Sequence, residues 1–67
     1  MNYETIVVEN CRSAAVVRFD RPEKRNAISL QMMRELVDAA RIAEDDSAVR
    51  TLILTGGPRF FSSGVDL

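Results

Sequence analysis

The chain of 67 residues has no histidine, one cysteine and no tryptophan. Without histidine, neither a Ser-His or Cys-His nucleophile nor a histidine-ligated metal can form within these residues. The single cysteine, Cys11, excludes an intrachain disulfide and a cysteine metal cluster. No base or second cysteine accompanies it, so we expect no reactive thiol. We also expect no metal site.

Long apolar runs and a strong charge imbalance are missing too. No run approaches the ~20 apolar residues that span a bilayer, and the start shows no targeting pattern. The formal net charge of −1 does not call for nucleic acid or an anionic membrane as a partner. We therefore expect a cytoplasmic protein. A chain this short forms at most one small domain, which buries only about 60% of its surface.

Two stretches rich in β-formers predict an antiparallel hairpin over 3–9 and 14–20. Between them, Asn10 tolerates a left-handed backbone, which suits a tight turn. Pro22 cannot join a strand ladder, so we expect a loop over 21–28.

Ser29 is a good N-cap, and a helical pattern follows it to about Asp45. The apolar stripe expected to face the core is made of Met33, Leu36, Val37, Ala40 and Ala43.

A near-continuous apolar run over 49–55 is typical of a strand buried on both faces, and Gly56-Gly57-Pro58 ends it. Strand, helix and strand make a βαβ unit with parallel strands and a right-handed crossover. The predicted fold class is therefore α/β: an N-terminal β-hairpin plus one βαβ unit. One such unit leaves a sheet face and a strand edge open, so we expect residues 1–67 to be the N-terminal part of a larger domain.

Two stretches near the end offer weak support for chemistry. The Gly56-Gly57-Pro58 turn lacks both glycine-rich phosphate fingerprints, so we expect a plain turn. Ser62 and Ser63 lack the G-x-S-x-G elbow and a histidine base, so neither is expected to be a nucleophile.

Gly64 and the cations of the 21–28 loop leave two readings open. Glycine permits a turn, or it lets the N–H of Val65 point at a ligand oxygen, which is a strong catalytic device. Likewise Arg21, Lys24 and Arg25 form either a solvated loop or a contact for a phosphate-bearing ligand.

Three motifs in order resemble the N-terminal part of the crotonase superfamily (enoyl-CoA hydratase/isomerase). They are the stretch 20–29 (DRPEKRNAIS), the strand with its glycine over 49–56 (VRTLILTG) and the loop 61–67 (FSSGVDL). With the leading hairpin, the resemblance covers essentially all of the chain. It implies a spiral of ββα units and a single crotonase-like acyl-CoA-binding domain, of which residues 1–67 are an incomplete part.

The resemblance also implies a function. Family members bind an acyl-CoA thioester and stabilise its enolate or oxyanion with two peptide N–H groups, in reactions that include fatty acid metabolism. The first donor corresponds to Val65, whereas the second donor and the catalytic carboxylates would lie beyond this chain, which alone should be inactive. No cofactor is implied besides the CoA thioester substrate, and the full-length protein would be a homotrimer or homohexamer. The residues that would hold the CoA portion are Lys24, Arg25, Ala27, Ser63, Gly64, Val65, Asp66 and Leu67.

The chain departs from the family pattern at three positions. Asp20 stands where Asn is common, Ser63 where Ala is frequent, and Asn10 apparently replaces the hairpin glycine. Hydratase, isomerase, hydrolase, dehalogenase and decarboxylase reactions all stay open, as does the acyl chain. Two other readings are a non-catalytic interaction module, suggested by the open sheet face, and a nucleotide-binding α/β module.

Overall fold

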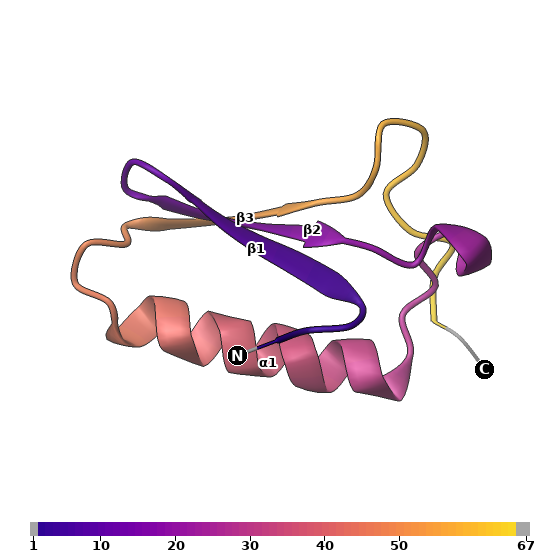
Figure 1. The fold of residues 1–67 in the computed structure, drawn as a ribbon, viewed down its shortest axis with the longest axis horizontal. Helices are drawn as coiled ribbons and strands as arrows, with labels where there is room; N and C mark the ends of the chain where they lie inside the picture. The colour runs from indigo at the N-terminus through magenta and orange to yellow at the C-terminus, as the bar shows by residue number, and fades with distance from the viewer. Residues whose placement is uncertain (1, 66–67) are drawn as a thin grey trace.

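A computed structural model describes residues 2–65 and contains one helix packed on one face of a three-stranded sheet (Figure 1). This arrangement confirms the predicted α/β class. The elements, in order, are β1 (Ile6–Cys11), β2 (Ala14–Phe19), the 3-10 helix η1 (Pro22–Lys24), α1 (Leu30–Asp45) and β3 (Thr51–Thr55).

The sheet has the strand order β1-β2-β3. β1 pairs antiparallel with β2, and β2 pairs parallel with β3, across the crossover that α1 provides. The predicted hairpin and the predicted parallel pair are therefore both confirmed. The predicted loop over 21–28 is confirmed as well, with η1 as a single turn inside it.

The first strand begins three residues later than predicted, because residues 3–5 bind α1 instead of β2. Tyr3 Oη donates to Asp38 Oδ2 at 2.7 Å. Thr5 donates its N–H and its Oγ–H to Glu35 Oε1, at 2.9 and 2.7 Å. The hydrogen bond to Asp38, with burial and the nearby carboxylates, raises the pKa of Tyr3 to about 12. These bonds tie the start of the chain to the helix.

The hairpin turn forms two residues later than predicted. Asn10 lies inside β1, where it pairs with Ala15, and Arg12 takes the left-handed conformation with a φ of 57°. The prediction that Asn10 replaces a turn glycine is therefore wrong. The ladder extends to the Cys11–Ala14 pair, which leaves only Arg12 and Ser13 to turn the chain. Cys11 is exposed and free at the end of β1.

The helix begins and ends where predicted. Ser29 caps it, because its Oγ accepts the N–H of Met32 at 3.1 Å, and α1 ends at Asp45. Within residues 2–65, no helix has the length and apolar character of a membrane span.

The helix face that packs on the sheet differs from the predicted one. Met32 and Ala39 are the buried residues of α1, whereas Met33 and Val37 are 39% and 52% exposed. The predicted stripe is therefore wrong at Met33 and Val37. It is right that Leu36 packs against the core, and Ala40 and Ala43 are half-buried. Apolar residues occupy two adjacent stripes of α1, and contact with β1 and β2 selects one of them. The core cluster is made of Ile6, Val17, Phe19, Met32 and Ala39.

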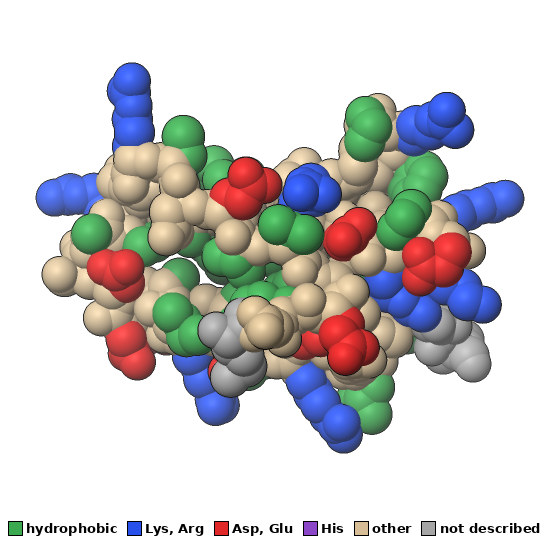
Figure 2. All heavy atoms as spheres, in the orientation of Figure 1, with side chains coloured by type: hydrophobic (Ala, Val, Ile, Leu, Met, Phe, Trp, Pro, Cys, Tyr) green, Lys and Arg blue, Asp and Glu red, His purple; other side chains and the backbone are tan. Residues whose placement is uncertain are grey.

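Strand β3 is formed but not buried. Leu52, Ile53 and Leu54 are 41%, 44% and 48% exposed, although their apolar run is typical of a strand covered on both faces. Helix α1 packs mainly against β1 and β2, so neither face of β3 is fully covered within residues 2–65. Figure 2 shows that charged side chains are scattered over this face of the molecule, whereas apolar side chains gather between the sheet and the helix.

Candidate functional site

Two loops that are far apart in the sequence lie side by side at one end of the molecule. Ser63 donates its N–H to the carbonyl oxygen of Arg25 at 3.0 Å, and Ile28 donates to that of Gly64 at 2.9 Å. Ile28 and Val65 form a parallel bridge. The loop after β2 and the loop after β3 are thus joined backbone to backbone, as the positions of their strands in one sheet require.

Asn26 anchors this junction, a role that no sequence pattern predicted. Its side chain is 3% exposed. Its Oδ1 accepts the N–H of Arg21 at 2.9 Å, and its Nδ2 donates to the carbonyl oxygen of Phe61 at 3.2 Å. Its φ of 56° follows a φ of 52° at Arg25. Asn tolerates this left-handed backbone better than most residues, which is the signal that the sequence offered.

Ser62 holds the second loop in place. Its Oγ donates to the carbonyl oxygen of Asn26 at 2.8 Å and accepts the N–H of Gly64 at 3.0 Å. The hydroxyl therefore satisfies backbone groups of both loops.

Gly64 directs the backbone at the end of this loop. Its φ is 104°, and a Cβ at this position would meet nothing within 4 Å. Glycine is therefore required by the backbone angle and not by crowding. The N–H of the next residue, Val65, makes no hydrogen bond with any residue among 2–65. Residue Val65 as a whole is 60% exposed.

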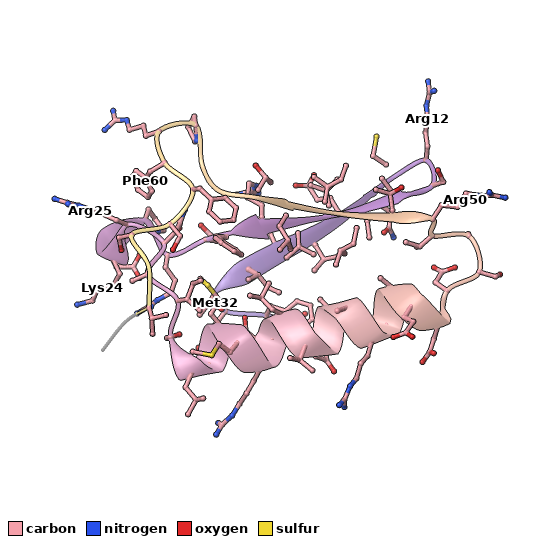
Figure 3. The ribbon with its side chains drawn as sticks, turned by 180° about the vertical axis from the view of Figure 1, so that it is seen from behind. Arg12, Lys24, Arg25, Met32, Arg50 and Phe60 are labelled. Carbon is pink, nitrogen blue, oxygen red and sulfur yellow. The ribbon has the colours of Figure 1, made fainter. Side chains whose placement is uncertain are left out.

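The predicted cations divide into two kinds. The half-buried Arg21 points inward, and its Nη1 donates to the carbonyl oxygen of Ala27 at 2.5 Å. Lys24 and Arg25 extend outward at the same end of the molecule as Phe60, whereas Arg12 and Arg50 lie at the opposite end (Figure 3). Two of the three cations of this loop are thus presented to solvent beside Ser63, whose Oγ lies 3.4 Å from the carbonyl oxygen of Lys24.

The turn after β3 is structural, in keeping with the expectation of a plain turn. A Cβ on Gly56 would lie 2.4 Å from the carbonyl oxygen of Phe60, so only glycine fits there. Gly57 donates to the same oxygen at 3.0 Å. The ring of Phe61 packs against Phe19, with centroids 4.9 Å apart. These contacts fasten the second loop to the sheet.

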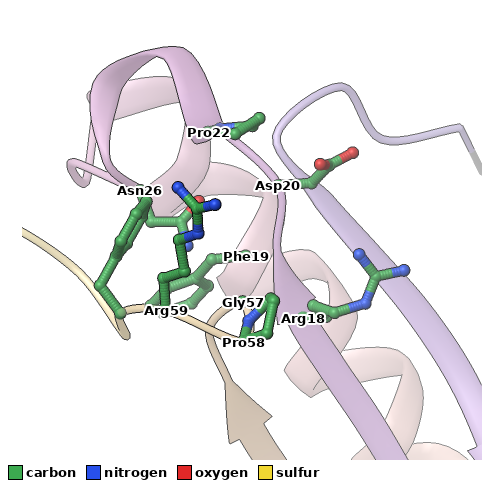
Figure 4. A pocket seen from close by; sticks show the side chains of 9 residues that line it. Arg18, Phe19, Asp20, Pro22, Asn26, Gly57, Pro58 and Arg59 are labelled. Atoms are coloured by element: carbon green, nitrogen blue, oxygen red, sulfur yellow. The ribbon is translucent and has the colours of Figure 1, made fainter.

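A cleft of about 380 Å³ opens beside the two loops (Figure 4). The lining residues are Arg18, Phe19, Asp20, Pro22, Asn26, Gly57, Pro58, Arg59 and Phe60. It shares only Asn26 with the junction, and none of the predicted site residues lines it. Asp66 and Leu67, which were also predicted to contact the ligand, lie outside the described residues. Among residues 2–65, no group of three or more metal-ligating side chains comes together.

The sequence matches the model of one protein family, described as enoyl-CoA hydratase/isomerase, over residues 9–67. A probable enoyl-CoA hydratase of Mycobacterium leprae is 34% identical over 67 residues, which are 100% of this chain and 26% of that protein. A mitochondrial Delta(3,5)-Delta(2,4)-dienoyl-CoA isomerase of Mus musculus is 39% identical, over 98% of this chain and 20% of its own. A 4-chlorobenzoyl coenzyme A dehalogenase-2 of an Arthrobacter species is 42% identical, over 92% of this chain and 22% of that protein.

Solved structures agree with this match. A crystal structure of an enoyl-CoA hydratase/isomerase from Mycobacterium paratuberculosis superposes with a TM-score of 0.93 at 38% identity, covering 98% of this chain and 26% of that one. The chain thus spans about a quarter of the length of such relatives. By its sequence and by its fold, the chain belongs to the enoyl-CoA hydratase/isomerase (crotonase) family.

Proposed function

We propose that this chain forms part of a site that binds an acyl-CoA thioester, in which the N–H of Val65 stabilises the oxyanion of the reacting thioester. The observation that carries the proposal is the state of this donor. Gly64 turns the backbone with a φ of 104°, and the Val65 N–H is left without an acceptor among residues 2–65.

Such a donor suits the chemistry that the relatives' names share, which is a reaction on a CoA thioester. Negative charge develops on the thioester oxygen as an enolate or tetrahedral species forms. A preorganised N–H aimed at that oxygen is worth about 2.7–4 kcal/mol of transition-state stabilisation. A second donor and the acid and base groups would correspond to the part of the relatives that this chain does not cover, so residues 1–67 by themselves are expected to be inactive.

The rest of the proposed site holds the CoA portion. The outward-facing Lys24 and Arg25 suit phosphate groups, because charge-assisted hydrogen bonds to phosphate are strong. Ala27, Ser63 and Gly64 belong to the joined loops, whose backbone would guide the pantetheine arm toward Val65. Asp66 and Leu67 complete the set by resemblance alone. Hydration, isomerisation and dehalogenation all fit this arrangement.

The binding half of the proposal can be tested on the 67-residue chain by NMR. We expect free CoA to shift the amide signals of residues 24–27. Acetyl-CoA should shift these and the Val65 amide too, because only the thioester places a carbonyl oxygen there. Val65→Ala retains the N–H and should respond as the parent does. No shift with either ligand would contradict the proposed CoA site.

The catalytic half needs a complete enzyme. The chain can replace the segment of the Mycobacterium leprae relative with which it aligns along its whole length. We expect this chimera to hydrate a short enoyl-CoA. Val65→Pro, which deletes the donor, should lower kcat by about 10²–10³-fold, whereas Val65→Ala should not. A folded Val65→Pro chimera with the kcat of its parent would refute the role of this N–H.

A further inference from the structure

The N–H of Val65 belongs to the same peptide unit as the carbonyl group of Gly64. A trans peptide unit is planar, so its N–H and its C=O point in opposite directions. The carbonyl oxygen of Gly64 accepts the N–H of Ile28 at 2.9 Å. This hydrogen bond draws the carbonyl toward the loop after β2, and it therefore turns the N–H of Val65 away from that loop.

The peptide unit that precedes Gly64 is held as well. Its N–H, which is the N–H of Gly64, donates to Ser62 Oγ at 3.0 Å, and the same hydroxyl donates to the carbonyl oxygen of Asn26 at 2.8 Å. The hydroxyl is thus acceptor and donor in one short chain of hydrogen bonds, an arrangement in which each bond strengthens the other. Gly64 lies between two peptide units that are both fastened to the loop after β2.

Only one of these fastening groups is a side chain. Ile28 and Asn26 contribute backbone groups, whereas Ser62 contributes its hydroxyl. Glycine accepts the φ of 104° found at Gly64, but it accepts many other angles equally well and so cannot fix the backbone direction by itself. We propose that Ser62 is a positioning residue, whose hydroxyl fixes the direction of the Val65 N–H. The inference rests on the function proposed above, in which this N–H meets the thioester oxygen.

The direction of a donor affects the reaction step more than it affects binding. A hydrogen-bond donor stabilises a transition state when it is already aimed at the atom on which charge develops. A misplacement of about 1 Å can cost about 10²-fold in rate. The CoA portion is assigned to other residues, and Ser62 is not among them. Loss of its hydroxyl should therefore lower kcat and leave KM nearly unchanged.

Kinetics of the chimera described above test this role. We expect Ser62→Ala to lower kcat for a short enoyl-CoA by about 10–10²-fold and to change KM by less than about twofold. Ser62→Thr keeps a hydroxyl and should recover most of the lost kcat. Thr55→Val is the control and should keep the kcat of the parent. It removes another half-buried hydroxyl, which lies 3.4 Å from the carbonyl oxygen of Gly56 and makes no contact with the peptide units of Gly64.

A bound enolate gives a second measurement, which a loss of loop stability alone would not change. Acetoacetyl-CoA forms an enolate when it loses a proton between its two carbonyl groups, and ultraviolet absorbance measures the enolate fraction. At a fixed pH, this fraction in the bound ligand should fall in Ser62→Ala, while the affinity for free CoA stays that of the parent. Circular dichroism checks folding. If Ser62→Ala does not fold, Ser62→Cys takes its place, because its thiol has a similar shape and hydrogen-bonds weakly.

The failure of this inference can be told apart from the failure of the proposed function. If Val65→Pro lowers kcat but Ser62→Ala does not, the positioning role is overturned and the role of the donor stands. If Val65→Pro keeps the kcat of its parent, the proposed function is refuted, and the positioning role with it. A Ser62→Ala chimera that raises KM without lowering kcat, or that binds the enolate as the parent does, would also overturn the positioning role.

Discussion

Strands β2 and β3 are neighbours in one sheet and are both short and apolar, yet one lies in the core and the other at the surface. Val17 of β2 is 1% exposed, whereas Leu54, which pairs with it on β3, is 48% exposed. The difference comes from α1, which packs against β1 and β2. Burial in this sheet is therefore decided by the position of the helix and not by the hydrophobicity of the strand.

Removing the helix side chain that covers the core should have the largest effect. Met32 is fully buried, whereas its neighbour Met33 is 39% exposed. We expect Met32→Ala to lower the free energy of unfolding by about 2–5 kcal/mol, through lost burial and the cavity left behind. Met33→Ala is the control and should cost less than about 0.5 kcal/mol, as surface changes do. Urea denaturation measures both. Similar costs for the two variants would mean that α1 packs with the other stripe inward.

The next largest effect should come from separating the loops that follow β2 and β3. Asn26→Ala removes the hydrogen bond that the side chain donates to the carbonyl oxygen of Phe61. A buried group left without a partner costs about 1–3 kcal/mol. We expect that loss in urea denaturation, with altered NMR shifts over 61–65. Asn10→Ala, at an exposed position of β1, should change neither. Unchanged shifts in Asn26→Ala would show that the loops associate without this anchor.

A smaller effect should come from acid, which acts on the contact between the chain start and α1. Burial raises the pKa of Glu35, but the hydrogen bonds from Thr5, Glu4 and Gln31 outweigh it, so the pKa is lowered from 4.5. A lowered pKa stabilises the fold above pH 4.5, and this contribution is lost as the pH falls through the folded pKa.

Thermal unfolding between pH 6 and pH 3 measures this contribution. In the parent, Tm should fall as Glu35 is protonated. Glu35→Gln should start with a lower Tm and lose less of it over the same range. Glu44→Gln, at an exposed position of α1, should follow the parent. An acid profile of Glu35→Gln that is parallel to that of the parent would contradict this assignment.

The smallest effect is expected on β3 itself. Leu54→Thr should change the free energy of unfolding by about 0.5 kcal/mol or less, because the side chain is already half exposed. At the paired position of β2, Val17→Thr places a hydroxyl in the core and should cost about 1–3 kcal/mol. Equal costs would mean that β3 is covered in a way that residues 2–65 do not show.

Most of the fold was predictable because its signals are local. Ser29 caps a helix through its own side chain, Pro22 excludes a ladder, and strand pattern and crossover length set the parallel pair. The predictions that were wrong concerned contacts between residues distant in the sequence. The preference of residues 3–5 for α1 requires Asp38 and Glu35, and the choice between Met32 and Met33 requires the sheet. Neither can be detected within a short window of sequence.

The candidate site likewise has residues that the sequence could predict and residues that it could not. Gly64 was predictable as a turning point because glycine takes a positive φ without steric cost, and the resemblance to a family pointed to the N–H of Val65. The anchoring roles of Asn26 and Ser62 could not be predicted, because the bonds that join the two loops run to backbone groups 35 and 36 residues away. Every residue has a backbone carbonyl, so the sequence does not show which one a side chain will bind.

The sequence by itself determined which segments are strand, helix and turn, and that the chain resembles the crotonase family. The reason is that helix caps, side-chain periodicity and glycine placement act over a few residues. Only the tertiary structure decided that α1 covers β2 and leaves the side chains of β3 about half exposed. It also decided that the loops after these strands join beside Val65. Those outcomes depend on how surfaces distant in the sequence compete for contact, and no single stretch of the chain contains that information.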